Sequence, residues 1–188
     1  KFSTKDIEKK FNVNLNEKNI LLNYHPLTNN LKQSYQEFQN ILLSLQRLDN
    51  KIYNIFITSP NSDMGSSKII KQIKKIVRKK NFFYIKNLGS YYYSFLQKCI
   101  FLIGNSSSGV TDTVLLNVNT INIGERQKGR TMPDNVINAD HRKISVQKAI
   151  YKLLNKKSSK FRRPVSAKLN SSKLILKKIK IYLQNEKK

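Results

Sequence analysis

Cysteine is nearly absent from this chain, since Cys99 is the only one in 188 residues. A lone cysteine excludes an intrachain disulfide and a metal site built from several thiolates. Because Cys99 lies within the apolar run of residues 95–103, we expect it to pack as a small hydrophobic residue rather than to react as a thiol.

Long apolar runs are also lacking. No stretch approaches the uninterrupted apolar length of a membrane span, and residues 1–6 contain no hydrophobic segment of the kind that signal peptides carry. We therefore expect a cytoplasmic protein without a membrane-spanning segment.

Acidic residues are few, because 11 Asp and Glu oppose 36 Lys and Arg and leave a formal net charge of +25. Such a charge is typical of nucleic-acid-binding domains. The lysines are spread along the chain among many Asn and Ile residues, however, and only residues 152–188 are densely basic, with 13 Lys or Arg against the single acid Glu186. We interpret that stretch as a final amphipathic helix with a solvated basic face, and expect no nucleic-acid partner.

The length and the 39% content of hydrophobic residues fit one domain with one core. Short apolar runs predict strands at residues 20–24, 52–58, 82–85, 101–103 and 120–123. Helical spacing predicts helices at residues 5–11, 32–48, 66–80, 91–98, 111–117 and 146–155, followed by a loop containing Pro164. Strands that alternate with helices predict an α/β fold with a doubly wound, parallel, Rossmann-like sheet.

The most informative segment is residues 101–130, FLIGNSSSGVTDTVLLNVNTINIGERQKGR. A short buried strand is followed by small hydroxyl residues from Gly104 to Gly109, so the chain must turn there. We expect the next helix to start at these serines, because the first N–H groups of a helix lack partners inside it and stabilise an anion. Read alone, the serine turn could equally be a polar loop that caps a helix.

Two arginines favour the anion site. Arg126 and Arg130 follow the next strand, so they lie at the same carboxyl edge of the sheet, where ligands of open α/β sheets bind. A guanidinium suits a phosphate or a carboxylate. The segment lacks both the Gly-Lys-Ser/Thr ending of a P-loop and the second glycine of a nucleophile elbow.

The sequences GNSSSG at residues 104–109 and INIGERQKGR at residues 121–130 resemble the nucleotide-binding signature of the hydrolysing UDP-N-acetylglucosamine 2-epimerases, including relatives that act on diacetamido sugars. Residues 23–28, NYHPLT, resemble the H-P-x-T turn of that family, and residues 59–63, SPNSD, resemble its P-N-x-D turn. These motifs occur in the family's order, and the resemblance covers nearly all of residues 5–155, which correspond to the second half of such an enzyme.

This resemblance implies the C-terminal domain of a two-domain GT-B fold. Residues 1–19 would then be a linker from a missing N-terminal Rossmann-like domain, residues 20–158 the nucleotide-binding domain, and residues 159–188 a basic C-terminal helix or tail. It also implies a homo-oligomer, a UDP-sugar substrate, no cofactor and no metal.

The resemblance further implies a role for particular side chains. His25 matches an active-site histidine, although a histidine before Pro26 can also be an ordinary turn residue. The expected UDP-binding residues are Asn61, Asn87, Ser106, Ser107, Asp112 and Arg126. Asn61 could instead only form an Asx turn. His141 matches no motif, and we expect it at the surface.

Asp112 departs from the family pattern, which has Glu at this position to bind the ribose hydroxyls. The shorter carboxylate could lower affinity by about 1 kcal/mol or more unless a water or Thr111 restores the contact.

The implied reaction removes UDP from C1 of the sugar while C2 loses a proton, and water then adds to the resulting glycal to give the 2-epimer. Arg126 and the serine turn would stabilise the departing diphosphate, while the acid and base carboxylates would belong to the missing domain. A GT-B nucleotide-sugar glycosyltransferase domain and a non-enzymatic basic binding domain remain as alternatives.

Overall fold

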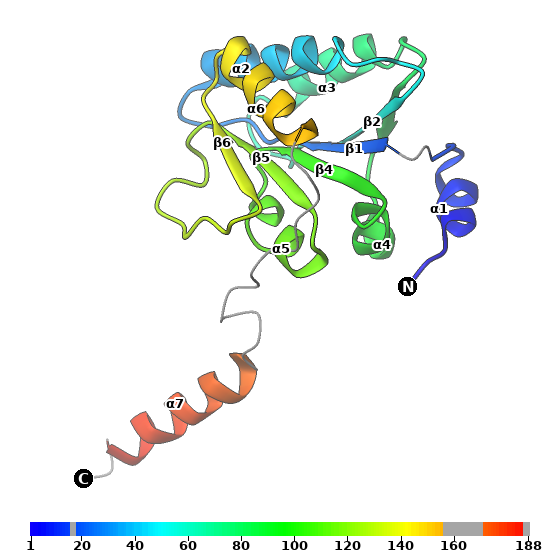
Figure 1. Ribbon diagram of the computed structural model, residues 1–188. Coiled ribbons are helices and arrows are strands. Elements are labelled where there is room, and N and C mark those ends of the chain that lie inside the picture. The colour runs from blue at the N-terminus through cyan, green and yellow to red at the C-terminus, as the bar shows by residue number, and fades with distance from the viewer. Residues whose placement is uncertain (16–17, 156–170, 186–188) are drawn as a thin grey trace.

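In the computed structural model, which describes residues 1–15, 18–155 and 171–185, a parallel sheet forms the centre of the fold (Figure 1). Its six strands lie in the order β3-β2-β1-β4-β5-β6, and every neighbouring pair is parallel. The strands are β1 (Lys18–Asn23), β2 (Tyr53–Thr58), β3 (Phe82–Ile85), β4 (Cys99–Gly104), β5 (Asn119–Ile123) and β6 (Val136–Ala139). The chain order therefore reverses between β1 and β4, which makes that pair the switch point of a doubly wound sheet.

Helices cover both faces of this sheet (Figure 1). One face carries α2 (Leu31–Leu45), α3 (Ser66–Ile76) and α6 (Lys143–Leu154), while the other carries α1 (Thr4–Phe11), α4 (Tyr92–Leu96) and α5 (Asp112–Leu116). Short 3-10 turns, η1 (Gly89–Tyr91) and η2 (Ser107–Gly109), precede α4 and α5.

Alternation along the central strands divides the core into two layers. On β1, Ile20 and Leu22 pack into the layer beneath α2, α3 and α6, whereas Leu21 packs into the layer shared with α1 and α4. All three side chains are fully buried. A strand that is apolar on both faces is typical of a parallel sheet covered on both sides, so the predicted fold class is confirmed.

Most predicted elements are present with shifted ends, but the sixth strand was not predicted. Residues 136–139, VINA, are only partly buried and contain Asn138, so no uninterrupted apolar run marks them. The lone cysteine is buried as expected, and burial raises the pKa of its thiol. The predicted loop around Pro164 lies outside the described residues.

The prediction that a helix starts at the serines is wrong. Residues Ser107–Gly109 form a single 3-10 turn, and α5 begins only at Asp112. The hydroxyl of Thr113 donates to the carbonyl of Gly109 at 2.8 Å and accepts from the Thr120 hydroxyl at 2.9 Å. Because this buried network fixes Gly109 against β5, the chain turns twice before it becomes α-helical.

Residues predicted to be an interdomain linker contain α1, which packs onto the domain. Ile7 is fully buried, and the ring of Phe2 stacks on that of Tyr91 with 3.7 Å between centroids. Whether these residues also lead to another domain stays a prediction.

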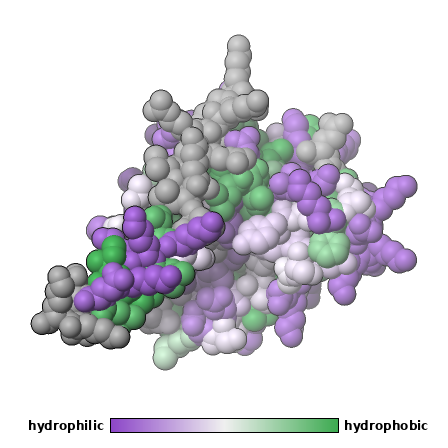
Figure 2. All heavy atoms as spheres, turned by 90° about the horizontal axis from the view of Figure 1, so that it is seen from below, coloured by the Kyte–Doolittle hydropathy of each residue, from purple (hydrophilic) through white to green (hydrophobic). Residues whose placement is uncertain are grey.

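The basic C-terminal segment contains the predicted amphipathic helix, α7 (Ser171–Asn185). In Figure 2 its green apolar and purple basic side chains lie beside each other, and Leu174, Ile179 and Leu183 are all exposed. Among the described residues, no helix is both long enough and apolar enough to cross a membrane.

The junction of β4 with the serine turn depends on glycine at position 104. Gly104 has φ +138°, and a Cβ atom there would lie 2.0 Å from the backbone oxygen of Asn23. We expect Gly104→Ala to lower the free energy of unfolding by roughly 3 kcal/mol or more, because backbone cannot move aside cheaply. Gly129→Ala is the matched control, since Gly129 also has positive φ, +84°, but no atom lies within 4 Å of the added carbon. Urea unfolding of both variants tests this, and equal losses would contradict it.

Candidate functional site

A cleft of about 620 Å³ opens at the carboxyl edge of the sheet. Each of the strands β1 to β5 ends at this edge, because all five run in the same direction. The cleft is lined by these residues predicted from the sequence: His25, Asn61, Asn87, Ser106, Ser107 and Arg126. The fold therefore brings together His25 and Arg126, which are 101 residues apart in the chain.

His25 is held as a neutral ring at the end of β1. Its side chain is nearly buried, and Nδ1 accepts a hydrogen bond of 3.0 Å from the backbone N–H of Asn61. Burial, followed by the positive charge of Arg126, lowers the pKa of His25 to about 4. Near neutral pH the ring is uncharged, and because Nδ1 accepts, Nε2 carries the proton and can act as a donor.

Asn105 connects the two strands at the switch point, and sequence reasoning did not single it out. Its Oδ1 accepts from the backbone N–H of His25 at 2.8 Å, and its Nδ2 donates to the backbone oxygen of His25 at 2.7 Å. The backbone oxygen of Asn105 in turn accepts from Arg126 Nη1 at 3.2 Å and from Gln127 Nε2 at 2.8 Å. One residue thus fixes both the histidine and the arginine.

The serine turn lies between these groups. Ser106 is nearly buried and Ser107 is half-buried. The first N–H groups of a 3-10 turn have no partner within the turn, so they are available to a ligand. The Ser108 hydroxyl is bonded to the hydroxyl of Tyr92, which also lines the cleft and was not predicted. Burial raises the pKa of Tyr92 to about 12, so its hydroxyl stays protonated.

Three further residues lie away from the lining. Asp112 begins α5 and is half-buried, but it is not among the side chains that line the cleft. Arg130 is exposed in the turn after Arg126. His141 is exposed, as predicted.

The cleft has a positive and polar lining. Its charged side chains are Arg126 and Lys86, and no carboxylate lines it among the residues that the structure describes. In the same described part of the chain, no three His, Cys, Asp or Glu side chains lie close enough to hold a metal ion. Such a lining suits an anionic ligand with hydroxyl or amide groups, such as a nucleotide.

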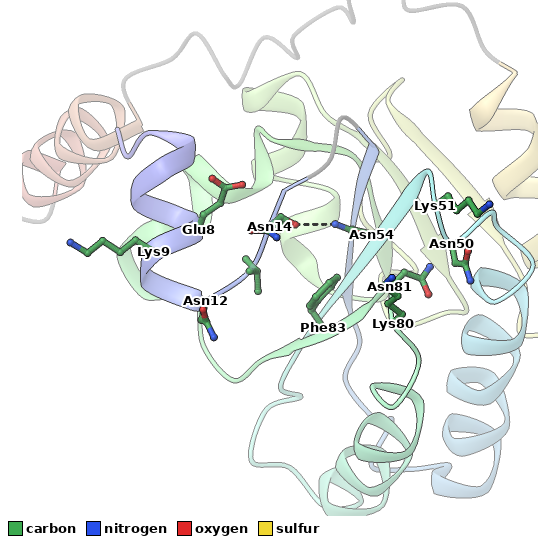
Figure 3. A pocket seen from close by; sticks show the side chains of 11 residues that line it. Glu8, Lys9, Asn12, Asn14, Asn50, Lys51, Asn54, Lys80, Asn81 and Phe83 are labelled. Atoms are coloured by element: carbon green, nitrogen blue, oxygen red, sulfur yellow. Dashed lines mark hydrogen bonds between the residues drawn. The ribbon is translucent and has the colours of Figure 1, made fainter.

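A second pocket, of about 790 Å³, lies at the amino edge of the sheet (Figure 3). Asparagines are prominent there, and two of them tie backbone segments together: Asn54 Nδ2 donates to the oxygen of Asn14 at 2.9 Å, and Asn81 Nδ2 donates to the oxygen of Tyr53 at 3.0 Å. The Asn14 contact joins the segment after α1 to β2, so these amides have a structural role.

The reversed strand order, with a polar cleft at the switch point, defines a Rossmann-like, doubly wound domain. The sequence pattern of the family described as UDP-N-acetylglucosamine 2-epimerase matches residues 1–180. The chain therefore belongs to the UDP-N-acetylglucosamine 2-epimerase family.

Two relatives illustrate the similarity. The GDP/UDP-N,N'-diacetylbacillosamine 2-epimerase (hydrolyzing) of Campylobacter jejuni is 36% identical over 140 residues, which are 72% of this chain. The UDP-N,N'-diacetylbacillosamine 2-epimerase (hydrolyzing) of Legionella pneumophila is 28% identical over 163 residues, or 86% of this chain. The matches span only 36% and 42% of these relatives' own lengths.

Solved structures agree on the fold. A structure of Staphylococcus aureus MnaA with UDP superposes with a TM-score of 0.70 at 18% identity, over 95% of this chain and 48% of that one. The UDP-GlcNAc 2-epimerase of Methanocaldococcus jannaschii gives 0.65 at 18% identity, over 85% of this chain and 45% of that one. The fold is thus that of one half of a GT-B-like protein.

The pKa of His25 reports directly on the position of Arg126. We expect Arg126→Ala to raise this pKa, because a nearby positive charge that disfavours the imidazolium is lost. An NMR titration measures this shift, and assignment needs only His141→Gln, since the chain has 2 histidines.

The same depressed pKa predicts how stability changes with pH. Because the pKa of folded His25, about 4, lies below the ordinary value of 6.5, protonation favours the unfolded chain. The contribution of His25 to the unfolding free energy is therefore complete above pH 6.5 and falls as the pH drops towards 4.

In the titration of Arg126→Ala described above, an unchanged pKa of His25 would show that the two groups are not coupled.

Proposed function

We propose that this chain is the UDP-sugar-binding half of a hydrolysing UDP-N-acetylglucosamine 2-epimerase. The substrate is UDP-N-acetylglucosamine or a UDP-diacetamido sugar, and the products are UDP and a free 2-epimerised sugar. Such sugars are precursors of sialic-acid-like components of cell-surface polysaccharides, and we place the reaction in the cytoplasm. The observation that carries the proposal is the convergence of His25, Ser106, Ser107 and Arg126 on one cleft in a chain of this family.

The diphosphate is the natural ligand for the centre of the cleft. In the proposal, Arg126 and the N–H groups at Ser106 and Ser107 bind its oxygens, as positive groups and donors arranged before the reaction do for a leaving group. Lys86 adds a second positive charge to the lining. Support comes from the absence of carboxylates along this lining within the described residues.

The nucleoside is assigned to the outer part of the cleft. Asn61 and Asn87 are exposed there, and Asn87 Oδ1 is already bonded to the N–H of Gly89 at 2.8 Å, which leaves its Nδ2 as the free donor. Asp112 is assigned to the ribose hydroxyls. Since its side chain does not line the cleft, this contact requires a rotation of the side chain or a bridging water.

His25 is proposed as the catalytic residue of this half. The neutral ring donates from Nε2 to an oxygen of the departing diphosphate or of the sugar, and the contact strengthens as negative charge develops on the leaving group. Loss of the C2 proton and of UDP from C1 gives a glycal. Water then adds across its double bond, with a proton to C2 and hydroxide to C1.

The acid and base for these steps are proposed to lie on a second Rossmann-like domain that precedes residue 1. The matches to the relatives span only about two fifths of the relatives' length, which supports the placing of the acid and base on a second domain. We further propose that the assembled enzyme is a homo-oligomer.

The proposal predicts that this chain binds UDP better than phosphate or uridine alone, and that Arg126→Ala weakens UDP binding about tenfold or more. Arg130→Ala is the matched control, because Arg130 has the same side chain but lies exposed outside the cleft lining. Isothermal calorimetry measures both affinities.

The same pair of variants extends the test to the full-length enzyme. Arg126→Ala is expected to lower kcat for UDP release from UDP-N-acetylglucosamine or its diacetamido analogue, while Arg130→Ala leaves kcat close to that of the wild type. Equal losses in the two variants, or UDP binding no tighter than that of phosphate, would rule out the assigned site.

A further inference from the structure

A carboxyl group is buried in the layer between the sheet and helices α2, α3 and α6. Glu37, on α2, has only 1% of its surface exposed. Its Oε2 accepts a hydrogen bond of 3.0 Å from the hydroxyl of Tyr24, whereas Oε1 has no partner among the described residues. Burial raises the pKa of Glu37. An apolar side chain would fill this place at lower cost, so packing alone does not account for a carboxyl group here.

The carboxyl group contacts the turn that carries Arg126. A Cβ atom added to Gly124 would lie 2.2 Å from Glu37 Oε1 and 3.1 Å from its carboxyl carbon. The carboxyl thus occupies the space that a side chain at position 124 would need. Gly124 has φ +69° and donates its N–H to the oxygen of Ala139 at 2.9 Å. The backbone of Gly124 is therefore held by Ala139 on one side and by the Glu37 carboxyl group on the other.

Tyr24, the hydrogen-bond partner of Glu37, is next to His25 in the chain. Tyr24 directly precedes His25 at the end of β1, and its hydroxyl lies 3.1 Å from the backbone oxygen of Ser34 on α2. Glu37 therefore connects the strand end that bears His25 with the turn that bears Arg126. No salt bridge joins Glu37 to Arg126 within the described chain. The contacts of Glu37 toward the site are those with Gly124 and Tyr24.

We propose that Glu37 is a positioning residue, whose carboxyl group, bonded to Tyr24 and packed against Gly124, holds Arg126 at a fixed distance from His25. The consequence for UDP binding depends on the function proposed above. The geometric statement does not, because the spacing of Arg126 and His25 is a property of the free protein.

Two substitutions of similar volume separate this role from packing. Glu37→Gln keeps an oxygen that accepts from the Tyr24 hydroxyl, whereas Glu37→Met fills the space without an acceptor and with a flexible side chain. Both replace a buried carboxyl group by an uncharged side chain, so neither introduces a buried charge. Ser44→Ala, at another buried polar position on α2, controls for a general loss of stability.

The first readout is the pKa of His25 without ligand. We expect Glu37→Met to raise it about as much as Arg126→Ala does, because Arg126 moves away from the ring. Glu37→Gln and Ser44→Ala should leave it at the wild-type value. If Glu37→Met leaves the pKa unchanged, or if Met and Gln shift it equally, the proposal is overturned, whether or not UDP binds.

The second readout is a double-mutant cycle for UDP affinity. Glu37→Met alone should weaken UDP binding about fivefold, and should have no further effect once Arg126 is alanine, because it acts through that side chain. Equal effects of Glu37→Met in both backgrounds would contradict action through Arg126. Failure of the wild-type chain to bind UDP would count against the proposed function alone, since the His25 titration still decides the role of Glu37.

Discussion

The arrangement of this site depends on one side chain, the carboxamide of Asn105. The carboxamide makes two hydrogen bonds to the backbone of His25, and the backbone oxygen of the same residue accepts a hydrogen bond from the guanidinium of Arg126. Since β1 and β4 are neighbours only because the strand order reverses between them, the contact exists only in the completed sheet. The pairing of β1 with β4 is therefore what brings His25 and Arg126 into one cleft.

A second constraint is the proximity of a positive charge to a histidine. Burial and Arg126 both disfavour the imidazolium, so His25 is a neutral donor in a positively charged cleft. Such an arrangement stabilises a departing anion by charge and by hydrogen bonding, without a proton transfer from the ring. The proposed function requires the same arrangement, because in it this chain binds the leaving group while acid-base chemistry at carbon takes place on another domain.

The sequence predicted the features that local patterns encode. The parallel sheet was predicted from short apolar strands that alternate with helices along the chain. The position of His25, Ser106 and Arg126 at one edge was predicted from the rule that the carboxyl ends of parallel strands meet at the same edge of the sheet. Local patterns did not predict the elements that depend on contacts between distant parts of the chain. The start of α5 is set by a network between Thr113 and β5, and the sixth strand is too short and polar to be recognised.

The role of Asn105 was also missed, because His25 is 80 residues away and nothing local marks the contact. Glu37 was not predicted either, because a polar residue on an amphipathic helix is usually expected at the surface. In both cases the informative fact is burial of a polar group, which becomes visible only in three dimensions.

In the proposed function, the diphosphate of UDP binds between the serine turn and Arg126. A crystal structure of this chain with UDP is the decisive experiment. We expect diphosphate oxygens within hydrogen-bond distance of the Arg126 guanidinium and of the N–H groups at Ser106 and Ser107, with His25 Nε2 facing the same group. UDP bound instead in the pocket at the amino edge of the sheet, or at the exposed Arg130, would contradict it.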